Sequence, residues 1–180
     1  MSGAESMALR DYIETSAASE RGPKTSTISA AMQFRGGCVR RHPQVHDFTI
    51  TAVVNAPIRT DGRDAGMGPD AAAIRTLLGR VAAILGHRML WWNRDIEELR
   101  RPVEWPAGVS GPRLPLLHWQ VRPTAENVAM WIAGWLSEQI ESTGPNSTLV
   151  ALELRESPHV AAVVRGVDIQ DCKGFPGPCS

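Results

Sequence analysis

The sequence lacks any long hydrophobic run and any excess of charge of one sign. None of its apolar stretches reaches the roughly 18 residues that a membrane span needs, and its 19 basic residues balance 19 acidic ones. The first absence argues against a membrane protein, and the second argues against a basic nucleic-acid-binding protein. The N-terminus also lacks the signal pattern of positive charge followed by apolar residues. We therefore expect a soluble, cytoplasmic protein whose partner is a small-molecule substrate, with no nucleic acid and no membrane.

Cysteine is scarce, and its three residues are an odd number. Two of them, Cys172 and Cys179, lie in a stretch rich in proline and glycine, which is a poor disulfide framework. We therefore expect Cys38 to be a free thiol in a reducing compartment. Hydrophobic residues make up 43% of the 180 residues, enough for the core of one domain. The expected organisation is a flexible N-terminal segment at 1–25, a domain at 26–166 and a C-terminal tail at 167–180.

Hydrophobic periodicity predicts the element order β-β-α-α-β-β. Alternation of apolar and polar residues indicates strands, and apolar residues three and four apart indicate helices. The predicted elements are strands at 26–34 and 47–56, a helix between an N-cap at Asp70 and Gly86, a second helix from Thr124, and closing strands at 148–156 and 159–166. This order favours an α+β fold in which two helices cover one face of a four-stranded antiparallel sheet.

An irregular stretch at 91–122 interrupts this order and carries four of the six tryptophans. So long a connection in a compact domain is usually functional or lies at an interface. Tryptophans that are not explained by helix periodicity are candidates to line an aromatic ligand pocket or to be buried between subunits. These are Trp91, Trp92, Trp105 and Trp119, whereas Trp131 and Trp135 have the spacing of core residues.

The densest group of reactive side chains lies at 34–48, FRGGCVRRHPQVHDF. The neighbouring arginines would favour the thiolate form of Cys38 or hold an anionic group of a substrate. They are Arg35, Arg40 and Arg41. His42 and His46 are four residues apart, which is about 13 Å along a straight strand. They would share a metal ion only if the chain bends at Pro43, and spacing alone favours two surface histidines.

Two further residues are candidates for proton transfer or substrate binding. His87 follows the first predicted helix, whose C-terminus would stabilise its imidazolium form. Taken alone, the position favours a simple interaction with the helix dipole over a role in proton transfer. Glu156 shares a strand face with Leu152 and Leu154, so we expect it to point inward. A buried carboxylate needs partners, and the N–H groups of a ligand can provide them. Solvation at the end of the strand is the simpler alternative.

Four segments in order resemble the family of 6-pyruvoyltetrahydropterin and 6-carboxytetrahydropterin synthases. They are GMGPD at 66–70, LGHRML at 85–90, PTAENVAMWIAGWL at 123–136 and LELRESP at 152–158. The resemblance covers about residues 26–166 and implies the tunnelling fold, in which three subunits close a barrel and two barrels often stack. A homotrimer or homohexamer with active sites between subunits is therefore expected. It also implies zinc held by three histidines, and proton transfer by a cysteine and an Asp-His pair.

The resemblance can be followed residue by residue. By this resemblance, Cys38 corresponds to the catalytic cysteine and His87 to the histidine of the Asp-His pair. Glu156 corresponds to the glutamate that binds the pterin. The two-histidine motif corresponds to His42 and His46. Met32 replaces the histidine of the first strand and Gly86 replaces the aspartate. Because a thioether is a weak ligand for zinc, we expect zinc, the one cofactor that the family implies, to bind poorly.

Three functions follow from these residues. The leading hypothesis is a divergent lyase or cyclase that acts by acid–base chemistry on a small aromatic or polycyclic metabolite of specialised biosynthesis. Its proposed proton carriers are Cys38 and His87, and its proposed substrate-binding residues are Glu156, Arg35, Arg41, Trp91 and Trp92. The second hypothesis is a zinc-dependent pterin synthase in which His118 completes the ligand set of His42 and His46. The third is a non-catalytic binding or scaffold protein that keeps the assembly.

Overall fold

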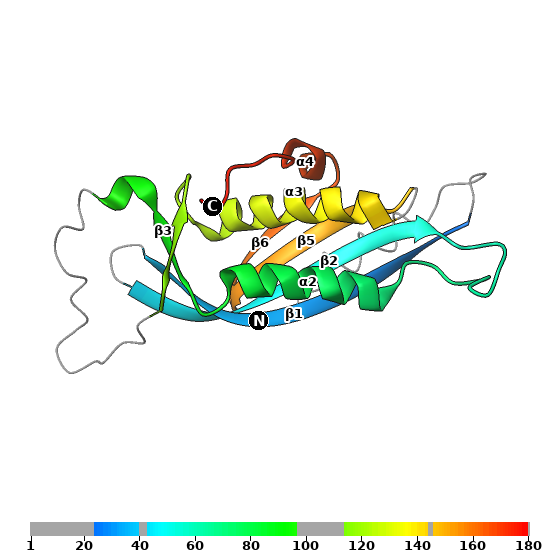
Figure 1. Cartoon of the computed structure of the whole chain (residues 1–180), viewed down its shortest axis with the longest axis horizontal. Helices are drawn as coiled ribbons and strands as arrows, with labels where there is room; N and C mark the ends of the chain where they lie inside the picture. Colours follow the sequence, from blue (N-terminus) through cyan, green and yellow to red (C-terminus); the bar gives the residue numbers. More distant parts are fainter. Residues whose placement is uncertain (1–23, 40–42, 97–113, 144–145, 180) are drawn as a thin grey trace.

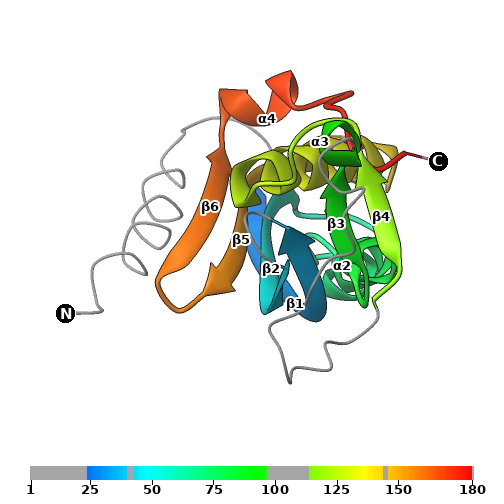
Figure 2. The same ribbon diagram turned by 90° about the vertical axis from the view of Figure 1, so that its left-hand side faces the viewer.

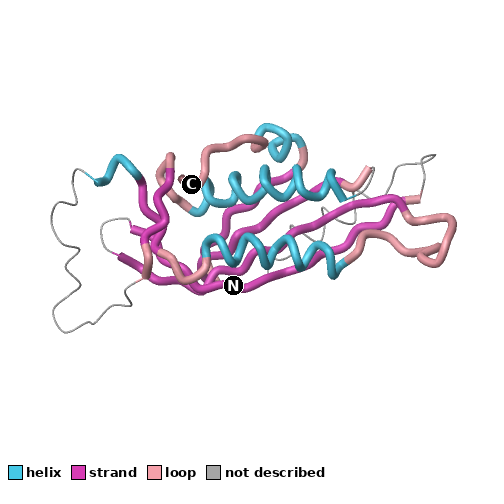
Figure 3. Tube along the Cα trace, viewed as in Figure 1, coloured by secondary structure: helices cyan, strands magenta, loops and turns pink. Residues whose placement is uncertain are grey.

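The computed structural model describes residues 24–39, 43–96, 114–143 and 146–179, and the predicted α+β order is found in it. Its elements are β1 (Thr25–Val39), β2 (Pro43–Pro57), α2 (Ala71–Leu85), β3 (Met89–Trp92), a short 3-10 helix η1 (Asn93–Ile96), β4 (Leu116–Trp119), α3 (Ala125–Thr143), β5 (Thr148–Ser157), β6 (Val160–Arg165) and α4 (Val167–Asp171). Helices α2 and α3 lie side by side across one face of the curved sheet (Figures 1 and 3). No helix in these ranges is long and apolar enough to cross a membrane.

The sheet has six strands, in the order β4-β3-β1-β2-β5-β6, where the sequence predicted four. The four predicted strands form its antiparallel part, and β1 and β2 form a hairpin paired from Thr25↔Pro57 to Val39↔Pro43. The two additional strands, β3 and β4, include residues at both ends of the stretch predicted to be irregular at 91–122, and they pair in parallel beside β1 (Figure 2). Each is only four residues long, too short for alternation to identify it.

The core lies between the sheet and the two long helices. Its fully buried side chains come from the inner face of the sheet and from the facing stripe of each helix: Ile50, Leu152, Leu154, Leu78, Val81, Leu85, Ile132 and Leu136. The first helix begins and ends as predicted. The backbone N–H of Ala72 donates to the Asp70 carboxylate at 2.8 Å, and Gly86 caps the C-terminus by donating its N–H to the Ala82 carbonyl.

The segment predicted as a C-terminal tail packs on α3 over residues 167–179. Ile169 and Cys172 are buried in the core, and the Lys173 ammonium lies 2.8 Å from the Glu141 carboxylate on α3. The hydrogen bond from Lys173 lowers the pKa of Glu141, and burial raises the pKa of the Cys172 thiol. These contacts fix the segment to the domain by apolar burial, which the pattern of glycines and prolines did not indicate.

Gly134 allows this close approach, and its substitution provides a test. A Cβ at Gly134 would lie 2.0 Å from the Cys172 carbonyl oxygen, whereas a Cβ at Gly79 of α2 would lie 3.8 Å from Met32 Cε, an ordinary contact. We expect Gly134→Ala to lower the free energy of unfolding by about 1–3 kcal/mol and to expose residues 167–179 to proteolysis. The matched control Gly79→Ala should raise it by about 0.5–1 kcal/mol. Urea unfolding measures both, and equal effects would contradict the packing described here.

Candidate functional site

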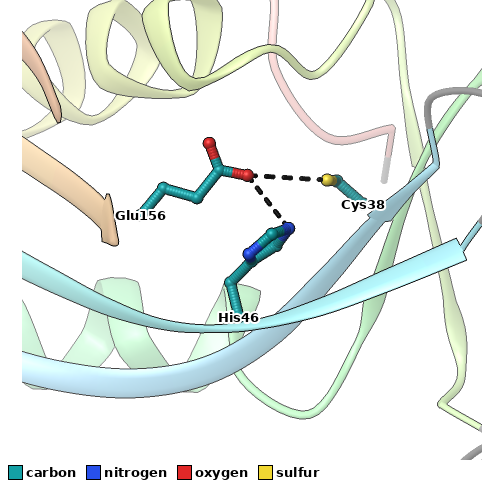
Figure 4. Close-up of side chains that lie close together, drawn as sticks. All are labelled: Cys38, His46 and Glu156. Carbon is teal, nitrogen blue, oxygen red and sulfur yellow. Dashed lines mark hydrogen bonds and ion pairs between the residues drawn. The ribbon is translucent and has the colours of Figure 1, made fainter. Parts of the chain in front are cut away.

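Three reactive side chains converge on the inner face of the sheet, at the end where β1 and β2 meet. Cys38 lies near the end of β1, His46 near the start of β2, and Glu156 near the end of β5 (Figure 4). The strand register brings them together. Gly36 pairs with His46, and Arg155 of β5 pairs with Thr49 of β2, so the end of β5 reaches the start of β2.

The Glu156 carboxylate lies between the other two groups. Its Oε1 atom is 3.0 Å from His46 Nε2, and the Cys38 thiol donates to the same oxygen at 3.9 Å. One ligand atom of each residue lies within 4.8 Å of the other two. Cys38 is 5% exposed and Glu156 9%, while the His46 side chain is 20% exposed. The cluster is therefore largely buried, as expected for a site that selects what enters it.

The contact between His46 and Glu156 has the distance of a hydrogen bond but not its alignment. Among the described residues, His46 Nε2 is a buried nitrogen without a hydrogen-bond partner of acceptable geometry, although Oε1 lies 3.0 Å away. Buried polar atoms are nearly always satisfied, so such an exception needs an explanation. The nitrogen keeps its capacity to bind a proton, a ligand or a metal ion.

Aromatic rings and two glycines form the wall beside the cluster. The His46 ring meets Phe48 edge-on, with 5.6 Å between centroids, and Phe48 stacks on Phe34 at 5.1 Å. A Cβ at Gly36 would lie 3.3 Å from the Phe34 ring, and one at Gly37 would lie 2.7 Å from Met89 Cε. The Gly36–Gly37 pair therefore lets the rings and β3 pack against β1 beside Cys38, a role that the sequence analysis did not recognise.

Of the predicted site residues, the structure brings together Cys38, His46 and Glu156. His87 has an exposed side chain and does not belong to this group; its N–H donates to the Arg35 carbonyl at 2.6 Å. Arg35 alternates with Phe34 and Gly36, so its side chain lies on the opposite face of the sheet, 3.8 Å from Asp47. His42, Arg40, Arg41 and Trp105 lie outside the described residues.

The three-histidine zinc set that the resemblance implies does not fit these residues. Met32 pairs with Ile50, four positions along β2 from His46, which is about 13 Å. Its methyl group lies beside Gly79 of α2, in the core. Strand alternation places Gln44, two positions before His46, on the same face, and His42 lies outside the described residues. His118 is half-buried on β4, outside the cluster.

Of the three described tryptophans in the predicted irregular stretch, two are buried and Trp92 is partly exposed. Trp91 and Trp119 are 4% and 0% exposed, and Trp119 meets Trp131 edge-on at 5.5 Å, so both are packing residues in this chain. Trp92 is half-buried, with the Arg122 guanidinium 4.6 Å from its ring centroid. It lies two positions beyond Leu90, the residue paired with Cys38. Of the two predicted substrate-binding tryptophans, Trp92 is thus the accessible one.

The fold and the position of the cluster define a protein of the tunnelling-fold class. The profile of the 6-pyruvoyl tetrahydropterin synthase family matches residues 23–167, and the chain belongs to this family. No curated protein matches the sequence.

Solved structures of low sequence identity share the fold. An uncharacterised protein from Wolinella succinogenes has a TM-score of 0.60 at 17% identity, covering 79% of this chain and 98% of its own. The 6-pyruvoyl tetrahydropterin synthase of Plasmodium falciparum has a TM-score of 0.55 at 14% identity, with 79% and 98% covered. That of Caenorhabditis elegans has a TM-score of 0.51 at 16% identity, with 80% and 97% covered. At these identities the likeness establishes the fold and leaves the reaction open.

Replacing His46 and Glu156 together by apolar residues separates a functional pair from a structural one. Exchanging both partners of a buried charged contact for apolar side chains of similar volume is often neutral or stabilising, whereas removing one partner alone is destabilising. We therefore expect the double variant His46→Leu/Glu156→Leu to keep the free energy of unfolding within about 1 kcal/mol of the native value, or to raise it. The control Leu154→Ala, on the same strand face, should lower it by about 2–5 kcal/mol. A loss in the double variant as large as in the control would identify His46 and Glu156 as structural residues.

Proposed function

We propose that this chain is a lyase- or cyclase-type enzyme that acts on a small aromatic or polycyclic metabolite at the Cys38–His46–Glu156 cluster. The observation that carries the proposal is the convergence of a thiol, an imidazole and a carboxylate in one largely buried place. Membership of the synthase family supports it, because the resemblance implies a lyase with a cysteine and a glutamate at these positions.

The chemistry of these groups suits elimination or ring closure. Both reactions need one group that takes a proton and another that delivers one. Thiols and imidazoles exchange protons near neutral pH, and a carboxylate accepts hydrogen bonds from the N–H groups of a heterocycle. Trp92, half-buried near this end of the sheet, offers an aromatic surface on which a planar ring can stack.

His87 belongs to this proposal through the assembly. Its imidazole is exposed, and the resemblance implies active sites between subunits. We therefore propose a homotrimer or homohexamer in which His87 carries protons at a site completed by a second copy.

A second candidate is synthesis of 6-pyruvoyl- or 6-carboxytetrahydropterin. It is favoured by the family match and by the inward carboxylate of Glu156 at the position of the pterin-gripping residue. Conversion of dihydroneopterin triphosphate is the reaction that would distinguish this candidate from a different small metabolite.

Mass spectrometry of small molecules tests both candidates. The native protein is incubated with dihydroneopterin triphosphate and, separately, with an extract of small metabolites; the variants Cys38→Ala and His87→Ala are treated in the same way. We expect the native protein to consume at least one aromatic metabolite and to yield a product that is an isomer or has lost water or phosphate. Each variant should lose at least about 100-fold in rate, the usual contribution of one proton-transfer group.

Either of two results would reject this function. If the native protein retains a metabolite unchanged, the chain is a binding protein and no enzyme. If Cys38→Ala and His87→Ala convert the metabolite as fast as the native protein, the reaction takes place elsewhere on the molecule.

A further inference from the structure

We propose that Cys38, His46 and Glu156 are the three protein ligands of one zinc-class divalent cation. This donor set replaces the three histidines of the family. The inference rests on the same site as the proposed function and makes Cys38 a metal ligand instead of a free acid–base group.

The distances between the donor atoms fit such a site. Zinc binds sulfur at about 2.3 Å and nitrogen or oxygen at about 2.0–2.2 Å, so that tetrahedral donors lie about 3–4 Å apart. His46 Nε2 is 3.0 Å from Glu156 Oε1, and Cys38 Sγ is 3.9 Å from the same oxygen. Small side-chain rotations therefore suffice to place all three around one ion.

The orientation of His46 supports the same conclusion. Its buried Nε2 atom faces the carboxylate without hydrogen-bond alignment. Two atoms that bind the same metal ion lie close together without hydrogen-bond alignment, because the lone pair of each atom is directed at the ion and not at the other atom. Figure 4 shows the thiol, the imidazole and the carboxylate pointing toward one another from separate strands.

Charge and donor type indicate which ion would bind. A thiolate and a carboxylate would bring two negative charges into a largely buried place, which is costly unless a cation neutralises them. The combination of sulfur, nitrogen and oxygen donors suits zinc and its neighbours, whereas magnesium and calcium prefer oxygen alone. Three protein ligands with an open fourth position are typical of catalytic zinc, which acts there as a Lewis acid.

Metal content of the full-length protein after incubation with zinc and removal of unbound ion tests the ligand set. We expect about one zinc per chain in the native protein. Each of Cys38→Ser, His46→Ala and Glu156→Gln should weaken zinc binding by at least about tenfold. Matched controls outside the cluster, Cys179→Ser, His159→Ala and Glu138→Gln, should bind as the native protein does. His42→Ala should also keep its zinc.

Cobalt in place of zinc gives a readout in the native protein that does not depend on turnover. A thiolate bound to Co²⁺ gives a strong charge-transfer absorption in the near ultraviolet, which we expect in the native protein and in Cys179→Ser but not in Cys38→Ser. Absence of this band from the native protein would overturn the inference, as would zinc that is retained by Cys38→Ser and lost by His42→Ala.

The same experiments separate this inference from the proposed function. Zinc that depends on Cys38, His46 and Glu156 in a protein that converts no metabolite would uphold the metal site and reject the enzyme. Full turnover by a native protein that takes up no zinc and gives no cobalt–thiolate band would uphold the enzyme and reject the metal site.

Discussion

The candidate site depends on the burial of the Glu156 carboxylate on the inner face of the sheet. A carboxylate at 9% exposure is costly to maintain unless other groups compensate for its lost hydration. The Cys38 thiol and the His46 imidazole are among the groups that the structure places beside it. Glu156 follows Leu152 and Leu154 on the inward face of β5. The same strand therefore contributes two core residues and, near its end, the buried carboxylate.

The sheet register turns this local feature into a site. Cys38 and Glu156 are 118 residues apart in sequence, and they meet because β2 lies between β1 and β5 in the sheet. The Phe34–Phe48 stack joins the site to the apolar core, and the Gly36–Gly37 pair lets β3 pack beside it. Each donor is thus held by a paired strand, which favours a fixed geometry.

Much of the fold could be predicted from local patterns. The first helix lies between Asp70 and Gly86 because a capping carboxylate and a terminal glycine act within one turn. The inward direction of Glu156 followed from strand alternation alone. The strands β3 and β4 could not be predicted, because four-residue runs carry no periodicity and their parallel pairing is non-local.

The candidate site was only partly predictable for the same reason. The residues Cys38, His46 and Glu156 could be selected by chemistry, but their meeting depends on pairings between distant strands. The resemblance directed attention to Met32, which the register pairs with Ile50, four positions along β2 from His46. The positions of the family's ligands in this chain can therefore be compared only once the pairing of β1 with β2 is known.

X-ray absorption at the zinc edge is the experiment that would show whether these three side chains form one functional centre. We expect a zinc shell with one sulfur at about 2.3 Å and nitrogen or oxygen donors at about 2.0–2.2 Å. A shell of nitrogen and oxygen alone in the zinc-loaded native protein would contradict it, because Cys38 would then stand outside the centre.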